Sequence, residues 1–262
     1  MRLMTGRRTI TALTLLILLT VVVAVRVRNG EAAVLRDGTK KGPNPIRVLL
    51  VTGGHLHDLE FYSLFNRPEL RQSELGRPEL RVTVDPHPAA FTGDIRQRYD
   101  VVVLYDMVRS LDEQRQQNLR DFVESGKGVV ALHHAICANV DWKWWVEEVI
   151  GGRYLFEPVG GRQSSYIHDR RQKISVVMEH EVTRGIGNFQ IVDETYKNLW
   201  ISPRVKVLLR SDDPTGDGPV AWIGPHQSSR VVYIQLGHDR QAYLNLRYQQ
   251  LVQQAIRWTA GR

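Results

Sequence analysis

The feature that most constrains the fold is a short apolar run ending in two histidines, Gly128-Val-Val-Ala-Leu-His-His-Ala135. A run of about four to six apolar, β-branched residues between Gly and a polar pair predicts a central strand of a parallel sheet. The helical pattern of Asp141 to Gly151 follows this run. His133 and His134 are therefore expected at a strand-to-helix turn, on the carboxyl edge where open α/β sheets bind ligands.

Similar apolar runs alternate with helical patterns in the first half of the chain. Strands are predicted at Ile46–Thr52, Leu80–Val84 and Tyr99–Tyr105. Helices are predicted from Leu59 to Phe65 and after Ser110, which opens a capping box with Glu113. Alternation of strands and helices with short connections predicts a doubly wound, mainly parallel α/β sheet.

The pattern changes after Arg153, where short apolar runs are separated by loops without helices. These runs predict antiparallel additions to the same sheet in the C-terminal half of the chain. A final helix, expected to pack on a face of the sheet, is predicted from Leu244 to Thr259. The four runs are Lys173–Met178, Val205–Arg210, Val220–Ile223 and Arg230–Gln235.

The net charge of +7 is concentrated at the N-terminus. Residues 1–46 hold 8 of the 35 basic and 2 of the 28 acidic residues. The other 216 residues, with 27 basic and 26 acidic groups, are close to neutral. A near-neutral domain lacks the basic surface that nucleic acid requires, so no nucleic-acid partner is expected.

Residues 10–25 form an uncharged apolar segment flanked by arginines, and they predict targeting to a membrane. As a helix they would be about 24 Å long, somewhat short for a bilayer core of roughly 30 Å. Residues 1–28 are therefore expected to be either a cleaved export signal or a retained anchor. Arg26 and Arg28 favour the anchor, and Gly30-Glu-Ala32 offers a weak cleavage site for the signal. The domain is expected outside the cytoplasm.

Residues 29–45 are expected to be a flexible linker to a single α/β domain at residues 46–260. The only cysteine, Cys137, excludes an intramolecular disulfide and leaves the compartment open. The sequence is compatible with a homo-oligomer and does not specify one.

Histidines follow several predicted strands, and parallel strands can bring such residues to a common rim. Imidazole and carboxylate groups together supply acid–base catalysis near neutral pH or a metal site. We expect the catalytic groups to be His133, His134, Glu194 and His238. Substrate-binding roles are expected for His55, His57, Trp144 and Asp193.

Each of these residues also has a structural interpretation, which the sequence leaves open. The histidines can satisfy the backbone of tight turns, Asp193 and Glu194 can cap a helix, and Trp144 can cover the sheet edge instead of stacking on a sugar. No HExxH or paired-cysteine pattern occurs, so no cofactor is assigned; the alternative is a divalent metal held by His and Glu. The remaining histidines are predicted to be solvated: His87, His168, His180 and His226.

With these residues identified, the chain resembles the ThuA-like (trehalose utilisation) family over about residues 46–260. The resemblance rests on an ordered set of segments rather than on one motif. They are Val48-Leu-Leu-Val-Thr-Gly-Gly-His55, His57-Asp58, Gly128-Val-Val-Ala-Leu-His133, Trp142–Gly151, His180-Glu-Val-Thr-Arg-Gly185, Asp193-Glu-Thr-Tyr196, Pro219-Val-Ala-Trp222, Arg230-Val-Val-Tyr-Ile-Gln-Leu-Gly-His238 and Ile256-Arg-Trp258.

The resemblance implies a flavodoxin-like sheet similar to that of class I glutamine amidotransferases, and a role in trehalose or keto-sugar utilisation. Amidotransferases carry a nucleophilic Cys at the elbow after the central strand, where this chain has His133-His134. Cys137 as the nucleophile would need a strand of about ten residues, longer than the usual five or six. Two functions stay open: an enzyme acting on a carbohydrate, and a non-catalytic carbohydrate-binding or scaffolding module at the membrane.

Overall fold

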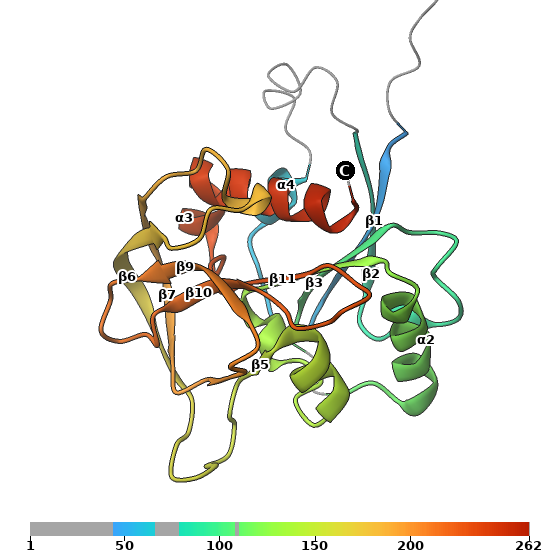
Figure 1. The fold of residues 1–262 in the computed structure, drawn as a ribbon, viewed down its shortest axis with the longest axis horizontal. Helices are drawn as coiled ribbons and strands as arrows, with labels where there is room; N and C mark the ends of the chain where they lie inside the picture. Colours follow the sequence, from blue (N-terminus) through green and yellow to red (C-terminus); the bar gives the residue numbers. More distant parts are fainter. Residues whose placement is uncertain (1–43, 66–78, 108–109, 262) are drawn as a thin grey trace, which may run out of the picture. The chain divides into compact units, whose positions relative to one another are not determined.

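The computed structural model describes residues 44–65, 79–107 and 110–261. Within these residues the main sheet has nine strands in the order β2-β1-β3-β4-β11-β10-β9-β6-β7 (Figure 1). The first five strands of this order pair in parallel. Their bounds are β1 (Ile46–Gly53), β2 (Leu80–Pro86), β3 (Val101–Asp106), β4 (Gly128–Leu132) and β11 (Val231–Ile234).

The C-terminal half extends this parallel core with antiparallel strands. A separate two-stranded pair, β5 with β8, lies outside the main sheet. This arrangement confirms the predicted α/β class with a parallel core and antiparallel additions. The bounds are β5 (Gly152–Arg153), β6 (Ser165–Val176), β7 (Phe189–Lys197), β8 (Trp200–Ile201), β9 (Lys206–Ser211) and β10 (Pro219–Ile223).

Helices cover both faces of the sheet, and each face has its own apolar core (Figure 1). Successive side chains of a strand point to opposite faces. Leu50 of β1 therefore packs in the apolar core between the sheet and α4, and Leu49 in the core between the sheet and α2. The helices are η1 (Leu59–Leu64), η2 (Ala89–Phe91), α2 (Glu113–Glu124), η3 (His133–Cys137), η4 (Trp145–Ile150), η5 (Glu181–Thr183), α3 (Arg240–Tyr243) and α4 (Leu246–Thr259).

The end of α4 lies directly against the start of β4. A Cβ atom on Gly128 would lie 2.5 Å from the backbone oxygen of Thr259, closer than atoms can pack. Glycine at position 128 therefore allows the C-terminal helix to approach the central strand.

Three helix boundaries differ from the sequence prediction. Helix α2 is capped by Asp112, whose side chain accepts from the Arg115 N–H, instead of by Ser110. The Leu111 N–H donates to the Asn139 side chain at 3.0 Å instead of joining the helix, and the cap lies two residues later than predicted. The predicted helix over 141–151 contains a π-helix, η4. The predicted last helix is α4, which begins after its cap Asn245, two residues later than predicted, and is preceded by the short helix α3.

Strand β7, which supplies the carboxylates of the site, was not predicted from the sequence pattern. Its segment Asp193-Glu-Thr195 is polar yet buried, and Thr195 is fully covered. A strand that buries carboxylates lacks the apolar alternation by which strands are recognised. The carboxylates of β7 instead meet polar partners in the site described below.

The predicted signal or anchor at residues 1–28 lies outside the described residues, as does almost all of the predicted linker at residues 29–45. In the part of the chain that the structure describes, no helix has the length and apolar character needed to cross a bilayer.

A charged contact joins the beginnings of β1 and β3. Asp100 accepts hydrogen bonds from the Arg47 backbone N–H at 3.0 Å and from the Arg47 guanidinium at 2.7 Å, and Lys127 lies 3.3 Å away. Burial by itself would raise the pKa of Asp100, but the hydrogen bonds from Arg47 and Lys127 outweigh it and hold the pKa well below its usual value. The ionised carboxylate therefore stabilises the folded state at neutral pH.

We expect Asp100→Asn to lower the free energy of unfolding by about 1 kcal/mol at pH 7, because the pair is partly exposed. Since the folded-state pKa is depressed, the contribution is present above the unfolded pKa near 4 and is lost as the pH falls toward the folded value. Urea unfolding of both proteins at pH 7 and pH 3 measures this. A difference that does not shrink at pH 3 would contradict the role of the charge.

Candidate functional site

The central element of the site is the sharp turn at the end of β4. His133 has φ of 48°, an uncommon value for a residue other than glycine, and it begins the short helix η3. The succession of strand, strained turn and helix is similar to the elbow that presents the nucleophile in α/β-hydrolases. Neighbouring β11 supports the turn: the Tyr233 hydroxyl donates to the His133 carbonyl at 2.9 Å.

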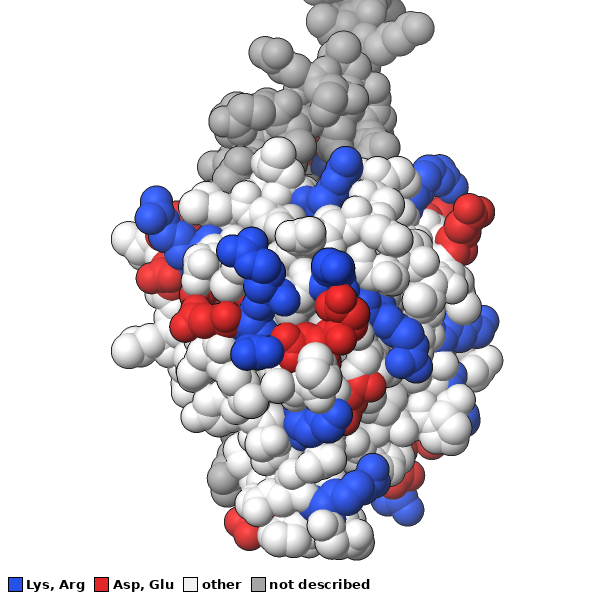
Figure 2. All heavy atoms as spheres, turned by 90° about the vertical axis from the view of Figure 1, so that its left-hand side faces the viewer, with Lys and Arg blue, Asp and Glu red and all other residues white. Residues whose placement is uncertain are grey.

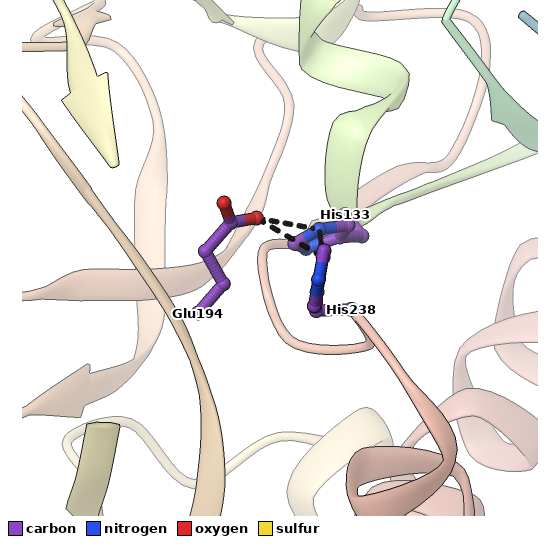
Figure 3. Close-up of side chains that lie close together, drawn as sticks. All are labelled: His133, Glu194 and His238. Atoms are coloured by element: carbon purple, nitrogen blue, oxygen red, sulfur yellow. Dashed lines mark hydrogen bonds and ion pairs between the residues drawn. The ribbon is translucent and has the colours of Figure 1, made fainter. Parts of the chain in front are cut away.

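His133 meets two partners from distant parts of the chain (Figure 3). Its Nε2 lies 2.9 Å from Oε2 of Glu194, on β7, and 3.2 Å from Nδ1 of His238, in the loop after β11. The same Glu194 oxygen lies 3.3 Å from His238 Nδ1. The structure thus brings three of the four predicted catalytic residues into direct contact.

Asp193 lies behind this cluster and holds the loop that carries His238. Its carboxylate accepts hydrogen bonds from the backbone N–H groups of Gly237 at 2.7 Å and of His238 at 3.0 Å. It also accepts from the N–H of Glu194 at 2.8 Å. The Asp193 side chain is buried among these donors and does not line the pocket, so it orients the two groups beside it.

The cluster opens into a cavity of about 470 Å³ at the carboxyl edge of the sheet. Predicted residues on its wall include His134 and His55, whose ring centroids are 4.8 Å apart. Other lining residues come from the segment after β5 and from β6. They are Tyr154, Phe156, Gln163, Ser164, Tyr166 and His168.

Besides Asp193, two other predicted binding residues do not line this cavity. His57 donates to or accepts from the Tyr62 hydroxyl at 3.1 Å and packs on the rings of Phe61 and Tyr105. Trp144 packs against Trp142 with the rings tilted by 37° and their centroids 5.1 Å apart, and the Arg120 guanidinium carbon lies 4.2 Å from the centre of the Trp144 ring. The structure therefore gives both residues packing partners away from the cluster.

His168 is a site residue that the sequence analysis missed, since it was predicted to be solvated. It is half exposed, but its Nδ1 lies 3.5 Å from Oε1 of Glu194, and its ring centroid is 4.6 Å from that of His238. The period of two in β6, which places Tyr166 and His168 on the same face, is the signal that could have identified it. His168 is thus exposed as predicted, whereas the same prediction was wrong for His87, which is buried with Nδ1 2.6 Å from Asp106.

Glu194 and His238 of the cluster, and the neighbouring His134, have perturbed pKa values. Burial raises the pKa of Glu194, but hydrogen bonds with His133 and His238 outweigh it and leave the pKa well below its usual value. The hydrogen bond with Glu194 raises the pKa of His238. Burial, with His133 and His55 nearby, lowers the pKa of His134 to about 2. At neutral pH the site thus holds an ionised carboxylate beside a neutral His134.

Cys137 lines the cavity but lacks the features of a nucleophile. Burial raises the pKa of its thiol to about 12, so almost no thiolate is present near neutral pH. Strand β4 ends at Leu132, so the elbow is at His133 and not at Cys137.

The protein is thus an α/β protein with a doubly wound sheet, antiparallel additions and a His/Glu cluster at the carboxyl edge of the sheet. Residues 47–259 match the family model ThuA, described as trehalose utilisation. The chain therefore belongs to the ThuA family. No curated protein matches the sequence.

Similar solved structures share the fold. A putative ThuA-like protein from Parabacteroides merdae has a TM-score of 0.67 at 21% identity, with 83% of this chain and 90% of that chain covered. A second one, from Bacteroides uniformis, has a TM-score of 0.60 at 19% identity, with 82% and 92% covered. A β-galactosidase from Bacillus circulans is similar over 82% of this chain but only 31% of its own, with a TM-score of 0.54 at 12% identity.

We expect Asp193→Asn to lower the free energy of unfolding by about 1–3 kcal/mol. The amide has the size of the carboxylate, but its NH₂ group would face a buried backbone N–H donor and leave it without an acceptor. Urea unfolding measures the change, with Glu157→Gln, on the exposed loop after β5, as the control. Equal stability of the Asp193 variant and the wild type would show that the carboxylate does not hold the His238 loop.

Proposed function

We propose that this protein is an enzyme of carbohydrate utilisation that acts on a trehalose-related disaccharide or a keto sugar. The observation that carries the proposal is the contact of one carboxylate and two imidazoles, within 3.3 Å of one another, on the wall of a cavity. Groups of this kind exchange protons with hydroxyl and carbonyl groups or polarise them. The family description, trehalose utilisation, supports a sugar as the substrate.

The shape and lining of the cavity suit a sugar. Its volume of about 470 Å³ lies within the roughly 300–1,000 Å³ typical of small-molecule sites. Tyr154, Phe156 and Tyr166 offer aromatic faces for the apolar side of a sugar ring, in place of the predicted Trp144. Gln163 and Ser164 line the same wall with polar groups for hydroxyls.

The four predicted catalytic residues receive different roles in this proposal. His133, Glu194 and His238 form the reaction centre that contacts the reacting oxygen of the sugar. His134, with its low pKa, stays neutral and is a weak base, so it shapes the wall beside His55 instead of transferring a proton. Chemistry that needs a thiolate is disfavoured, because the pKa of Cys137 is about 12.

His133→Asn tests the proposal, because Asn tolerates the positive φ at this position while it removes the imidazole. We expect turnover of trehalose, its keto derivatives and related disaccharides to fall by at least about 100-fold, the usual contribution of a positioned acid–base group. Product formation followed by chromatography measures it. Cys137→Ala is the contrasting variant and is expected to retain turnover. Unchanged turnover in His133→Asn would contradict the proposal that His133 belongs to the reaction centre.

The second candidate function is a non-catalytic carbohydrate-binding or scaffolding module. It is favoured by the elbow itself, where His133-His134 offers neither a thiol nor a hydroxyl nucleophile. Calorimetric titration separates the two functions: sugar binding without any product over hours supports the module, and binding followed by product supports the enzyme.

We propose that nucleic acid is not a partner, and the charges on one face of the described residues agree with this proposal. On the face shown in Figure 2, basic and acidic side chains are interspersed and no extended basic stripe is present. Mixed charges of this kind do not create the attractive potential that phosphate backbones require.

We further propose that residues 10–25 bring the protein to the membrane, with the domain outside the cytoplasm. Fractionation of expressing cells is expected to place the full chain in the membrane or exported fraction, and a chain lacking residues 1–28 in the soluble cytoplasmic fraction. The mass of the purified full chain distinguishes a cleaved signal from a retained anchor. An identical distribution of the two chains would contradict the targeting role.

A further inference from the structure

We infer that His133, Glu194 and His238 bind a divalent transition-metal ion at the end of the cavity. The inference deepens the proposed function, because it assigns a cofactor to the same reaction centre. It rests on the spacing of three ligand atoms, on the hydrogen bonds that fix them, and on their access to the cavity.

The spacing of the three atoms matches the edges of a coordination polyhedron. The distances are 2.9 Å from His133 Nε2 to Glu194 Oε2, 3.2 Å from His133 Nε2 to His238 Nδ1, and 3.3 Å from His238 Nδ1 to Glu194 Oε2. Two ligands bound about 2.1 Å from an ion at angles of 90° to 109° lie roughly 3.0–3.4 Å apart. One ion can therefore contact all three atoms with little movement.

The hydrogen bonds around His133 leave a lone pair directed at this point. Its Nδ1 lies 2.7 Å from the backbone carbonyl of Gln235, which only accepts, so Nδ1 carries the proton. In neutral imidazole the other nitrogen, Nε2, then has no hydrogen and faces the Glu194 carboxylate. A bond from the ring N–H to a backbone carbonyl is the usual way in which proteins orient a metal-binding histidine.

The cluster also needs a positive charge. The 2.9 Å contact of Nε2 with the carboxylate is a hydrogen bond when His133 is protonated; when the imidazole is neutral both atoms are acceptors, and a cation is needed in place of that proton. The Tyr196 hydroxyl, 3.1 Å from Nε2, can donate to that nitrogen but leaves the carboxylate contact uncompensated. A divalent ion satisfies both acceptors and His238 at once.

Two further residues complete the surroundings of the site. Asp193 fixes the backbone of His238, and His168 lies with Nδ1 3.5 Å from the second Glu194 oxygen, where it can orient the carboxylate. All three ligand residues line the cavity, so a further ligand can reach an ion held there, as in catalytic metal sites with three protein ligands.

Two imidazoles and one carboxylate are a donor set for zinc or iron(II) rather than for magnesium or calcium, which prefer oxygen ligands. An ion held there would bind a hydroxyl or carbonyl oxygen of the sugar and polarise it. His168, which lines the cavity beside the cluster, would then accept the proton that the polarised hydroxyl loses.

Titration of the full, untagged chain with Zn²⁺ and Co²⁺ after chelator treatment tests the inference without any sugar. We expect one ion per chain, bound more tightly than about 10 μM, and a visible Co²⁺ spectrum without thiolate bands. Glu194→Gln and His238→Asn are expected to weaken binding at least about 100-fold, since even changes behind the ligands cost 10- to 100-fold. The control Glu157→Gln, on an exposed loop, is expected to bind like the wild type.

Absence of saturable binding, or binding unchanged in Glu194→Gln and His238→Asn, would overturn the inference. Circular dichroism checks that the variants are folded. If the Glu194 variant does not fold, the His238 variant alone tests the inference, because His238 is partly exposed and its replacement disturbs the fold less. The two proposals fail separately. Sugar turnover that depends on His133 without metal binding would support the proposed enzyme and contradict the metal site. Metal binding without turnover would support the metal site and contradict the proposed enzyme.

Discussion

The parallel pairing of β4 with β11 is the interaction on which the site depends. Its register places Leu132 opposite Ile234, so the two strands end together at one edge of the sheet. The residues that follow, His133 on one strand and Gln235 to His238 on the other, are therefore neighbours although about a hundred positions separate them. A shift of one residue in this register would turn the side chains to the opposite face and separate the imidazoles.

The sequence predicted the parallel half of the fold well, because buried parallel strands are continuous apolar runs that end in recognisable turns. It also placed His133 and His238 at strand ends, from which their meeting could be expected. The contact with Glu194 could not be derived in the same way, because β7 buries polar groups and its pattern does not resemble a strand. His168 was missed for a related reason: a single histidine in a polar, exposed strand carries no apolar periodicity.

The same features explain why the functional prediction was less specific than the fold. Core residues can be recognised by their period along the chain. The cluster combines residues from an elbow, a loop and an edge strand, and these do not share a common period. Trp144 illustrates the limit. Its aromatic face suggested a sugar platform, but tryptophans at 142 and 145 provide it with packing partners, and the cavity takes its aromatic wall from Tyr154, Phe156 and Tyr166.

Strand β7 is the last strand in the order of the main sheet, and β6 is its only partner there within the described residues. Edge strands open by local fluctuations that leave the rest of a domain intact. If β7 separates from β6, Glu194 leaves the cluster while the parallel strands and α4 keep their packing. Heat is therefore expected to disrupt the His133/Glu194/His238 cluster at a lower temperature than the one at which the core melts.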